Sequence, residues 1–434
     1  MEILGIIAEY NPFHSGHLYH LQKAKELTGA KYCVAVMGGN FLQRGEPAFF
    51  NKWTRSLMAL NAGVDIVIEM PFVFASQNSR GFASAGIGIL NALGVVNYLA
   101  FGCENNQIEI LNSLAEILEK EPDFYKKILR DEIKKGNSFP RIREIALTEY
   151  YKKYGERHIK ITIEEIKNVL QQPNNILALE YLISLRKTKS SIMPVTVKRV
   201  GSNYLQEKLE GQYSSATAIR RRIIRNILNN NKGPLRGLEK VLPDFSYKVI
   251  LDELEKGLNP VTISCFEQVL LTQLRKMSLD EISMIYGVQE GLENRLKVGA
   301  NSSFDIESLI KNVKSKRYTQ TRIQRILIHS LFFLTHKEVE MFNKKGPLYC
   351  RVIGMTENGK LILKKIKKHS KLPIIIKLKN FIKENRENEN AVLQKMLDYD
   401  ILSTDLYVLG YNLRTARIAG QDFIKNTLIL NNSN

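Results

Sequence analysis

The first hundred residues of this chain alternate short, uninterrupted apolar runs with segments of helical spacing. Four runs have the length of a strand: Ile3 to Ala8, Tyr32 to Met37, Val64 to Met70 and Val95 to Phe101. Helical spacing fills the intervals, at His17 to Leu27, Lys52 to Ala62 and Ser79 to Leu93. Apolar strands separated by helices are typical of a parallel sheet covered on both faces. We therefore predict an α/β fold whose ligands bind beyond the carboxyl ends of the strands, at the edge that carries His14, Gly39 and Gly102.

The first turn from strand to helix reads YNPFHSGH and carries two histidines around a glycine. Pro12 ends the apolar run, and Gly16 lets the backbone come close to a ligand. The first helical amides and the imidazoles of His14 and His17 can donate hydrogen bonds to phosphate oxygens. The turn is therefore a candidate site for a nucleotide triphosphate. An ordinary helix start or a metal site is the alternative, but neither histidine is followed by a carboxylate or cysteine at ligand spacing, so we expect no metal ligands here.

The charge composition of the chain indicates which class of molecule it binds. Among 434 residues, 63 Lys and Arg outnumber 44 Asp and Glu, giving a formal charge of +19, so a polyanion such as nucleic acid is a candidate partner. A Lys-rich and Asn-rich proteome would give the same excess. No stretch reaches the roughly 18 apolar residues that cross a bilayer, and Glu2 beside a core strand argues against a signal peptide, so we expect a cytoplasmic protein without a membrane partner. Four scattered cysteines predict neither disulfides nor a zinc site.

The rest of the chain is expected to be mostly helical. Between Ile108 and Leu185 the spacing is helical, and Val195 to Val200 predicts a fifth strand. The string SSATAIRR from Ser214 then predicts either a second helix start that faces phosphate or an ordinary serine-capped helix with a basic face. A polar stretch at 229–234 predicts the boundary between a first domain, 1–230, and a mostly helical second domain, 235–434.

Near the C-terminus the sequence predicts a hairpin. Two strand-like runs, Tyr349 to Gly354 and Leu361 to Ile366, flank the turn-forming triplet that begins at Glu357. The tail beyond Leu428 is expected to fray.

A basic segment in the second half is the strongest sign of a nucleic-acid partner. The sequence KNVKSKRYTQTRIQR has no acidic residue and offers cations for phosphates and a ring for stacking on a base. Its candidate RNA contacts are Lys311, Lys314, Lys316, Arg317, Tyr318, Arg322 and Arg325. A second run follows, at Lys364, Lys365, Lys367, Lys368 and Lys371. Each run alone could be a solvated face; together, beside a nucleotide site, they favour RNA binding.

Six motifs in this order give the chain a family resemblance: EYNPFHSGHLYH, NFLQRGEPAFFNKWTR, FGCEN, PNNILALEY, KRVG and SKRYTQTRIQR. The chain resembles the bacterial tRNA(Met) cytidine acetate ligases, which lie in the HIGH-type nucleotidyltransferase superfamily. The resemblance implies a Rossmann-like parallel-sheet nucleotidyltransferase domain over 1–230 and a mostly helical tRNA-binding domain over 235–434. It implies a ligase that uses ATP to adenylate acetate and then transfers the acetyl group to the N4 amine of the wobble cytidine of elongator tRNA(Met). Magnesium is expected with the triphosphate.

The resemblance also assigns residues. It places His14 and His17 at the phosphates as catalytic residues. Its ATP-binding set is Ile7, Ala8, Glu9, Tyr10, Asn11, Pro12, Phe13, His14, Ser15, Gly16, His17, Leu18, Tyr19, His20, Gly102, Asn174, Asn175 and Arg199. Ala178 stands where the family pattern has glycine, and Ala216 departs from the second triphosphate motif of the superfamily.

Some assignments stay open. Lys52 and Arg44 are plausible extra contacts to phosphate or tRNA, or Arg44 simply pairs with Glu46 on a loop. A small-molecule adenylyltransferase of the HIGH superfamily would explain the HSGH turn but not the C-terminal half. The third functional hypothesis is an RNA-binding protein with an inactive nucleotide pocket.

Overall fold

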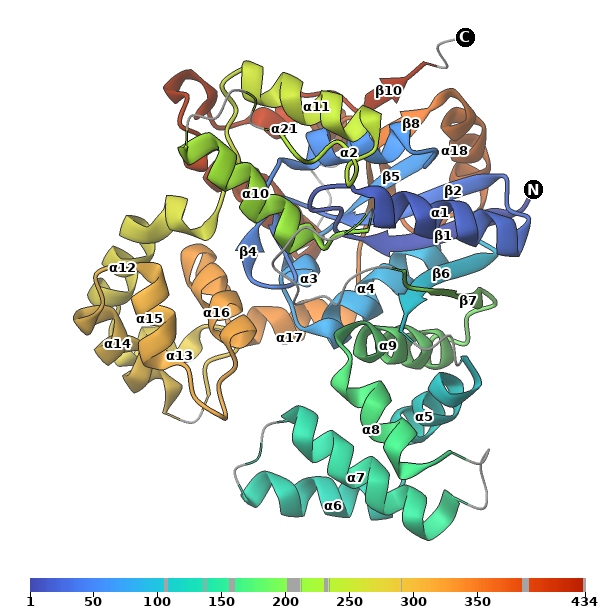
Figure 1. Cartoon of the computed structure of the whole chain (residues 1–434), viewed down its shortest axis with the longest axis vertical. Coiled ribbons are helices and arrows are strands. Elements are labelled where there is room, and N and C mark those ends of the chain that lie inside the picture. The colour runs from blue at the N-terminus through green and yellow to red at the C-terminus, as the bar shows by residue number, and fades with distance from the viewer. Residues whose placement is uncertain are drawn as a thin grey trace.

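The computed structural model describes residues 1–104, 108–135, 137, 139–155, 161–200, 211, 213–229, 233, 235–289, 291–384 and 390–431. Within these residues the central element is an eight-stranded, mostly parallel sheet in the order β10-β8-β5-β2-β1-β6-β7, with β9 beside β8 (Figure 1). Its strands are β1 Ile3–Ala8, β2 Tyr32–Gly38, β5 Ile66–Met70, β6 Tyr98–Cys103, β7 Met193–Lys198, β8 Cys350–Thr356, β9 Ile374–Ile375 and β10 Leu428–Leu430. The five strands predicted from the sequence are present and mutually parallel, so the α/β prediction is confirmed.

Successive residues of the inner strands bury their side chains on opposite faces of the sheet. Ile3, Val34 and Ile66 belong to one core cluster, whereas their neighbours Leu4 and Ala35 belong to another. Both faces are therefore covered, which explains why these strands are apolar throughout. The covering helices of the N-terminal part are α1 Ser15–Thr28, α2 Lys52–Asn61, α3 Phe72–Ala75 and α4 Ser79–Ala92, and α10 Ala216–Leu228 and α11 Asp244–Glu255 join them.

Two helical groups extend from the sheet (Figure 1). The first comprises α5 Ile108–Lys120, α6 Asp123–Lys134, α7 Phe139–Tyr154, α8 Ile163–Gln171 and α9 Pro173–Lys187. The second follows the 3-10 turn Ile263–Phe266 and comprises α12 Glu267–Lys276, α13 Leu279–Met284, α14 Leu292–Ser302, α15 Ile306–Val313, α16 Gln320–Phe332 and α17 His336–Lys345. A short antiparallel hairpin, β3 Phe41–Leu42 and β4 Glu46–Pro47, lies beside the second group.

The C-terminal part returns to the sheet, which corrects two expectations. The prediction of a hairpin around Glu357 is wrong, because Leu361 to Ile366 lies in helix α18, Glu357–His369, where Ile362 and Ile366 are buried one turn apart. The expectation that the tail frays beyond Leu428 is wrong up to Leu430, because β10 pairs in parallel with β8. The remaining helices are α19 Leu378–Glu384, α20 Ala391–Tyr407 and α21 Gln421–Ile424.

The region beyond residue 235 is mostly helical, as expected, but it also contributes β8, β9 and β10 to the central sheet. Most of the polar stretch at 229–234 lies outside the described residues. The division into 1–230 and 235–434 therefore stays a prediction. Among the described residues, no helix combines the length and the apolar character that a membrane span requires.

Candidate functional site

The HSGH turn holds its two imidazoles in a fixed arrangement at the start of α1. His14 is the N-cap, and its Nδ1 accepts a hydrogen bond from the backbone amide of Gly16 at 3.1 Å. The Nδ1 of His17 accepts from the backbone amide of His14 at 3.2 Å, and the two rings stack with centroids 3.8 Å apart. Because each Nδ1 is an acceptor, each neutral ring carries its proton on Nε2. The turn therefore presents two Nε2 donors.

Burial keeps these imidazoles neutral. It lowers the pKa of His14 to about 3, and the nearby Arg199 and Arg220 contribute to the decrease. The pKa of His17 lies well below its usual value for the same main reason, with His14 and Arg199 contributing. Burial and Arg199 lower the pKa of His20 to about 4, and the enclosed Nε2 of His20 has no hydrogen-bond partner among the described residues. At neutral pH the positive charge of this region therefore comes from the arginines.

The turn opens on a cavity of about 1150 Å³, which is larger than most pockets for a single small ligand. The predicted ATP-binding residues that line it are Ile7, Ala8, Glu9, Tyr10, Asn11, His14, Gly16, His17, Tyr19, His20, Gly102, Asn174 and Arg199. Gly102 lies beside the Arg199 side chain, where an added Cβ would approach Arg199 Cγ to 3.3 Å. The structure thus brings together segments that are far apart in the sequence.

Five predicted residues support this cavity without lining it: Pro12, Phe13, Ser15, Leu18 and Asn175. Phe13 is fully buried and packs against Tyr10 and His17. The side-chain oxygen of the buried Asn175 accepts a hydrogen bond from the backbone amide of Glu104 at 3.1 Å. Its neighbour Asn174 donates to the Glu104 carboxylate at 2.7 Å. The two asparagines therefore fix the loop after β6.

A second helix start faces the same cavity. Ser214, Ser215 and Ala216 line it, and Ser215 caps α10 by accepting from the backbone amide of Ala218 at 3.1 Å. From the next turn, Arg220 donates to the backbone oxygen of Asn11 at 2.9 Å. The SSAT segment is thus both a serine-capped helix start and a wall of the cavity that the HSGH turn faces.

The basic segment divides between the cavity and the surface. Arg317, Arg322 and Arg325 line the cavity, whereas Lys311, Lys314 and Lys316 lie outside it and are all exposed. The ring of Tyr318 is 5% exposed and its hydroxyl donates to the backbone oxygen of Gln289 at 3.3 Å, so the expectation that this ring stacks on a base is wrong.

Helix α16 packs against the β3–β4 hairpin. Arg325 donates to the backbone oxygen of Gln43 at 3.3 Å, and Gln324 donates to the Glu46 carboxylate at 3.2 Å. Gly45 has a φ of +74° and lies so close to the backbone of Arg325 that a side chain would collide with it. The hairpin thus fixes the arginine-bearing helix to the edge of the sheet.

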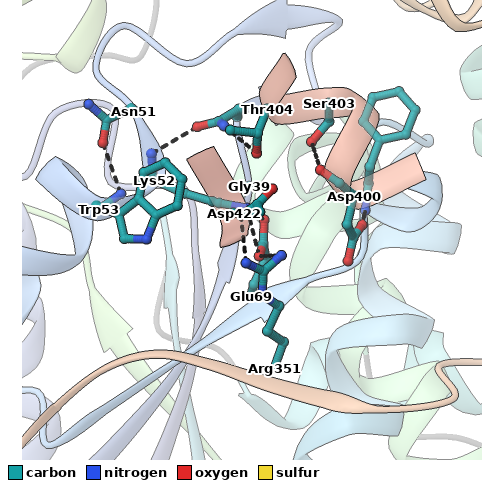
Figure 2. A network of polar contacts seen from close by, with 12 residues as sticks. Gly39, Asn51, Lys52, Trp53, Glu69, Arg351, Asp400, Ser403, Thr404 and Asp422 are labelled. Atoms are coloured by element: carbon teal, nitrogen blue, oxygen red, sulfur yellow. Dashed lines mark hydrogen bonds and ion pairs between the residues drawn. The ribbon is translucent and has the colours of Figure 1, made fainter. Parts of the chain in front are cut away.

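Lys52 lies in a closed ionic network and not in the cavity, so its assignment as a phosphate or tRNA contact is wrong (Figure 2). Its side chain is fully buried and contacts Glu69 at 2.7 Å and Asp422 at 2.8 Å. Arg351 contacts the same two carboxylates, at 3.2 and 2.5 Å. Arg44, in contrast, lines the cavity, and the Glu46 carboxylate lies 3.7 Å from Arg220.

Several residues that line the cavity, and one that fixes the strand ends beside it, were not identified from the sequence. Asn78, Ser79 and Arg80 at the start of α4, together with Tyr286 and His329, line the cavity, but no local pattern marks them. The fully buried Arg55 was also missed; it donates to the backbone oxygens of Glu9, Gly38, Gly39 and Phe50 and thereby fixes the ends of β1 and β2. The described residues contain no group of three or more His, Cys, Asp or Glu side chains placed to hold a metal ion.

Comparisons with known proteins agree with this architecture. A model of the HIGH Nucleotidyl Transferase family matches residues 1–422. The tRNA(Met) cytidine acetate ligase of Acetivibrio thermocellus is 42% identical over 99% of this chain and 100% of its own length. The enzyme of that name from Thermoanaerobacter sp. strain X514 is 44% identical over 98% of each chain.

Solved structures give the same result. Thermotoga maritima TmcAL without ligand superposes with a TM-score of 0.93 at 37% identity, covering 99% of this chain and 100% of that chain. A second form of that protein, bound with alpha-thio ATP, superposes with a TM-score of 0.90 at the same identity and coverage.

Proposed function

This chain belongs to the HIGH nucleotidyl transferase family and, within it, to the tRNA(Met) cytidine acetate ligases, and we propose that it activates acetate with ATP and acetylates the wobble cytidine of elongator tRNA(Met). One observation carries the proposal: two stacked, neutral imidazoles present Nε2 donors to a cavity whose other walls carry Arg199 and the arginines of α16. The alpha-thio ATP bound by the similar Thermotoga maritima protein supports a nucleotide in this cavity. A tRNA substrate implies a cytoplasmic location.

In the first step, an acetate oxygen attacks the α-phosphorus of ATP and pyrophosphate leaves, which gives acetyl-adenylate. Acetate is already ionised at neutral pH, so this step needs groups that stabilise negative charge more than it needs a base. The Nε2 donors of His14 and His17 meet the growing charge on the phosphates, with Arg199 beside them. The backbone amides at the starts of α1 and α10 add to this stabilisation, and the adenine lies near Gly102.

Magnesium is expected with the triphosphate. The described residues offer no cluster of three ligands, which fits an ion held mainly by phosphate oxygens, as is usual for Mg²⁺ bound with a nucleotide. When bound, the ion neutralises charge on the phosphates. His14, His17 and Arg199 orient the same phosphates for attack.

In the second step, the region from 235 to 434 presents the tRNA. Lys311, Lys314 and Lys316 contact phosphates outside the cavity, and Arg317, Arg322 and Arg325 contact phosphates next to the wobble nucleotide inside it. A cytosine amine is a weak nucleophile, so much of the rate comes from holding it against the mixed anhydride.

The test is to incubate the protein with ATP, labelled acetate and an elongator tRNA(Met) transcript, and to digest the RNA to nucleosides. We expect labelled N4-acetylcytidine, and none from a transcript whose wobble cytidine is replaced by uridine. Absence of acetylcytidine under conditions where ATP binds would overturn the proposal. Turnover with a mononucleotide acceptor and without tRNA would indicate a small-molecule adenylyltransferase instead.

A further inference from the structure

Four carboxylates line the cavity, and within the described residues Glu9 and Glu121 have no ion pair at 4 Å or less. Glu121 follows α5 in a helical group, whereas Glu9 lies in the segment that leads to the HSGH turn. Glu9 directly follows β1, and its Oε1 accepts a hydrogen bond from the backbone amide of Gln43 at 2.8 Å. Two other cavity carboxylates lie beside arginines: Glu46 is 3.7 Å from Arg220, and Glu180 is 2.6 Å from Arg143. The Glu9 carboxylate is therefore more available to a ligand than either of these.

The surroundings of Glu9 raise the pKa of its carboxyl group above the usual value. Burial is the main cause and Glu46 adds to the rise, while the hydrogen bond from the Gln43 amide and the charges of Arg44 and Arg55 oppose it. Tyr181 of α9 faces it from another element. A carboxylate whose pKa is raised accepts a proton more readily than one at the surface, and a base is most effective when its pKa approaches the working pH.

Glu9 lines the same cavity as the HSGH turn and the arginines of α16. On one side, Glu9 is joined through four residues of backbone to His14, at which the activated acetate would form. On the other side, its partner Gln43 lies on the hairpin that accepts a hydrogen bond from Arg325 of α16. Helix α16 carries arginines assigned to the tRNA. The residue that holds Glu9 by a hydrogen bond is thus the same one that holds Arg325, which connects Glu9 to the wall of the cavity formed by α16.

We propose that Glu9 is the general base of acetyl transfer, the group that takes the proton from the N4 amine of the acceptor cytidine. The inference rests on the function proposed above. The amine nitrogen forms a bond to the carbonyl carbon of acetyl-adenylate, the bond from that carbon to the phosphate oxygen breaks, and AMP leaves with the electron pair. The nitrogen gives one proton to the Glu9 carboxylate, which later releases it to water. Acetylcytidine, AMP and a proton are the balanced products.

The experiment separates the two steps in the full-length protein. Glu9→Gln keeps an oxygen that accepts from Gln43 but removes the base, and Glu26→Gln removes the same charge from the exposed face of α1 as a control. Acetate-dependent exchange of pyrophosphate into ATP reports the first step. Single-turnover acetylation of tRNA from preformed, enzyme-bound acetyl-adenylate reports the second. We expect Glu9→Gln to slow transfer about 10²-fold more than it slows exchange, because a change in ATP binding alters exchange whereas loss of the base alters transfer alone.

A pH profile and a conservative variant complete the test. Single-turnover transfer in the unmodified protein should rise with pH through one ionisation, and Glu9→Gln should lose that rise. Glu9→Asp should keep the rise at a lower rate, because the carboxylate is retained but withdrawn. If Glu9→Gln transfers the acetyl group as fast as the unmodified protein, the inference is overturned. The base would then be the phosphate of the departing AMP. An equal loss of exchange and transfer would overturn it in favour of a structural role. If the unmodified protein forms no acetylcytidine, the proposed function itself fails.

Discussion

Two polar clusters lie at the same edge of the sheet, one after β1 and the other at the end of β5, and they differ in how much of their hydrogen-bonding capacity the protein itself uses. In the closed network, Lys52 and Arg351 share two carboxylates, and the network ties α2 and β5 to β8 and α21 (Figure 2). At the HSGH turn, both Nδ1 atoms accept from backbone amides, but neither Nε2 has a protein partner among the described residues. The first cluster therefore serves the fold, and the second is available to a ligand.

The largest expected effect comes from breaking the closed network. Lys52→Met leaves two buried carboxylates with Arg351 as the cation that still contacts both, and loss of one member of a buried ionic group costs about 3–5 kcal/mol. We expect that decrease in the free energy of unfolding, measured by urea denaturation. Lys23→Met removes a half-exposed lysine of α1 whose ion pair with Glu26 lies at the surface, so it should leave the denaturation midpoint nearly unchanged. A stable Lys52→Met that has lost only tRNA acetylation would instead restore a role for Lys52 in the site.

The opposite result is expected at the HSGH turn. His17→Asn removes one of the two Nε2 donors that we propose for the phosphates, and loss of one such donor lowers a rate by about 10²–10³-fold. We expect that loss in acetate-dependent exchange of pyrophosphate into ATP, with an unchanged denaturation midpoint. Retained exchange, or a loss explained by unfolding, would contradict the contrast between the two clusters.

The pH dependence of stability gives a separate test of the buried polar residues near the closed network. Asp400 accepts hydrogen bonds from the amide of Phe72 and the hydroxyl of Tyr349, and burial raises its pKa to about 7, with Glu69 adding to the rise. The folded state therefore holds a proton that the unfolded state releases above about pH 4. This group stabilises the fold less as the pH rises from about 4 to about 7. Asp400→Asn should remove that slope from denaturation curves measured across this range; an unchanged slope would exclude Asp400 as its source.

The smallest effect is expected at the exposed lysines outside both clusters. If Lys311 contacts a phosphate as proposed, Lys311→Ala should decrease the slope of log affinity for tRNA against log salt by about 1. Binding measured at several salt concentrations would show this. An unchanged slope would restrict RNA contacts to the arginines inside the cavity.

The sequence predicted the parallel sheet because strands buried on both faces must be apolar throughout. It placed the HSGH turn correctly because a strand, a glycine-bearing turn and a helix are adjacent in the chain. It could not distinguish Lys52 from a ligand contact, because the partners Glu69, Arg351 and Asp422 come from three distant segments. The cavity position of Tyr286 and the hydrogen bonds of Arg55 were missed for the same reason.

The hairpin error around Glu357 has a local cause. The short apolar run Leu361 to Ile366 after a turn-forming triplet fits a strand, but Thr356 accepts a hydrogen bond from the amide of Gly359 and starts a helix that contains this run. Short apolar runs cannot be assigned by periodicity alone. Likewise, Tyr318 stands in a basic run that suggested exposure, whereas packing beneath Arg322 buries its ring.

The structure of this chain with alpha-thio ATP bound tests the central claim most directly. We predict phosphate oxygens within hydrogen-bond distance of Nε2 of His14 and of His17, with the contacts of Lys52 to Glu69 and Asp422 unchanged. Phosphates that lie away from both imidazoles, or that draw Lys52 out of its network, would contradict the assignment of one cluster to the ligand and the other to the fold.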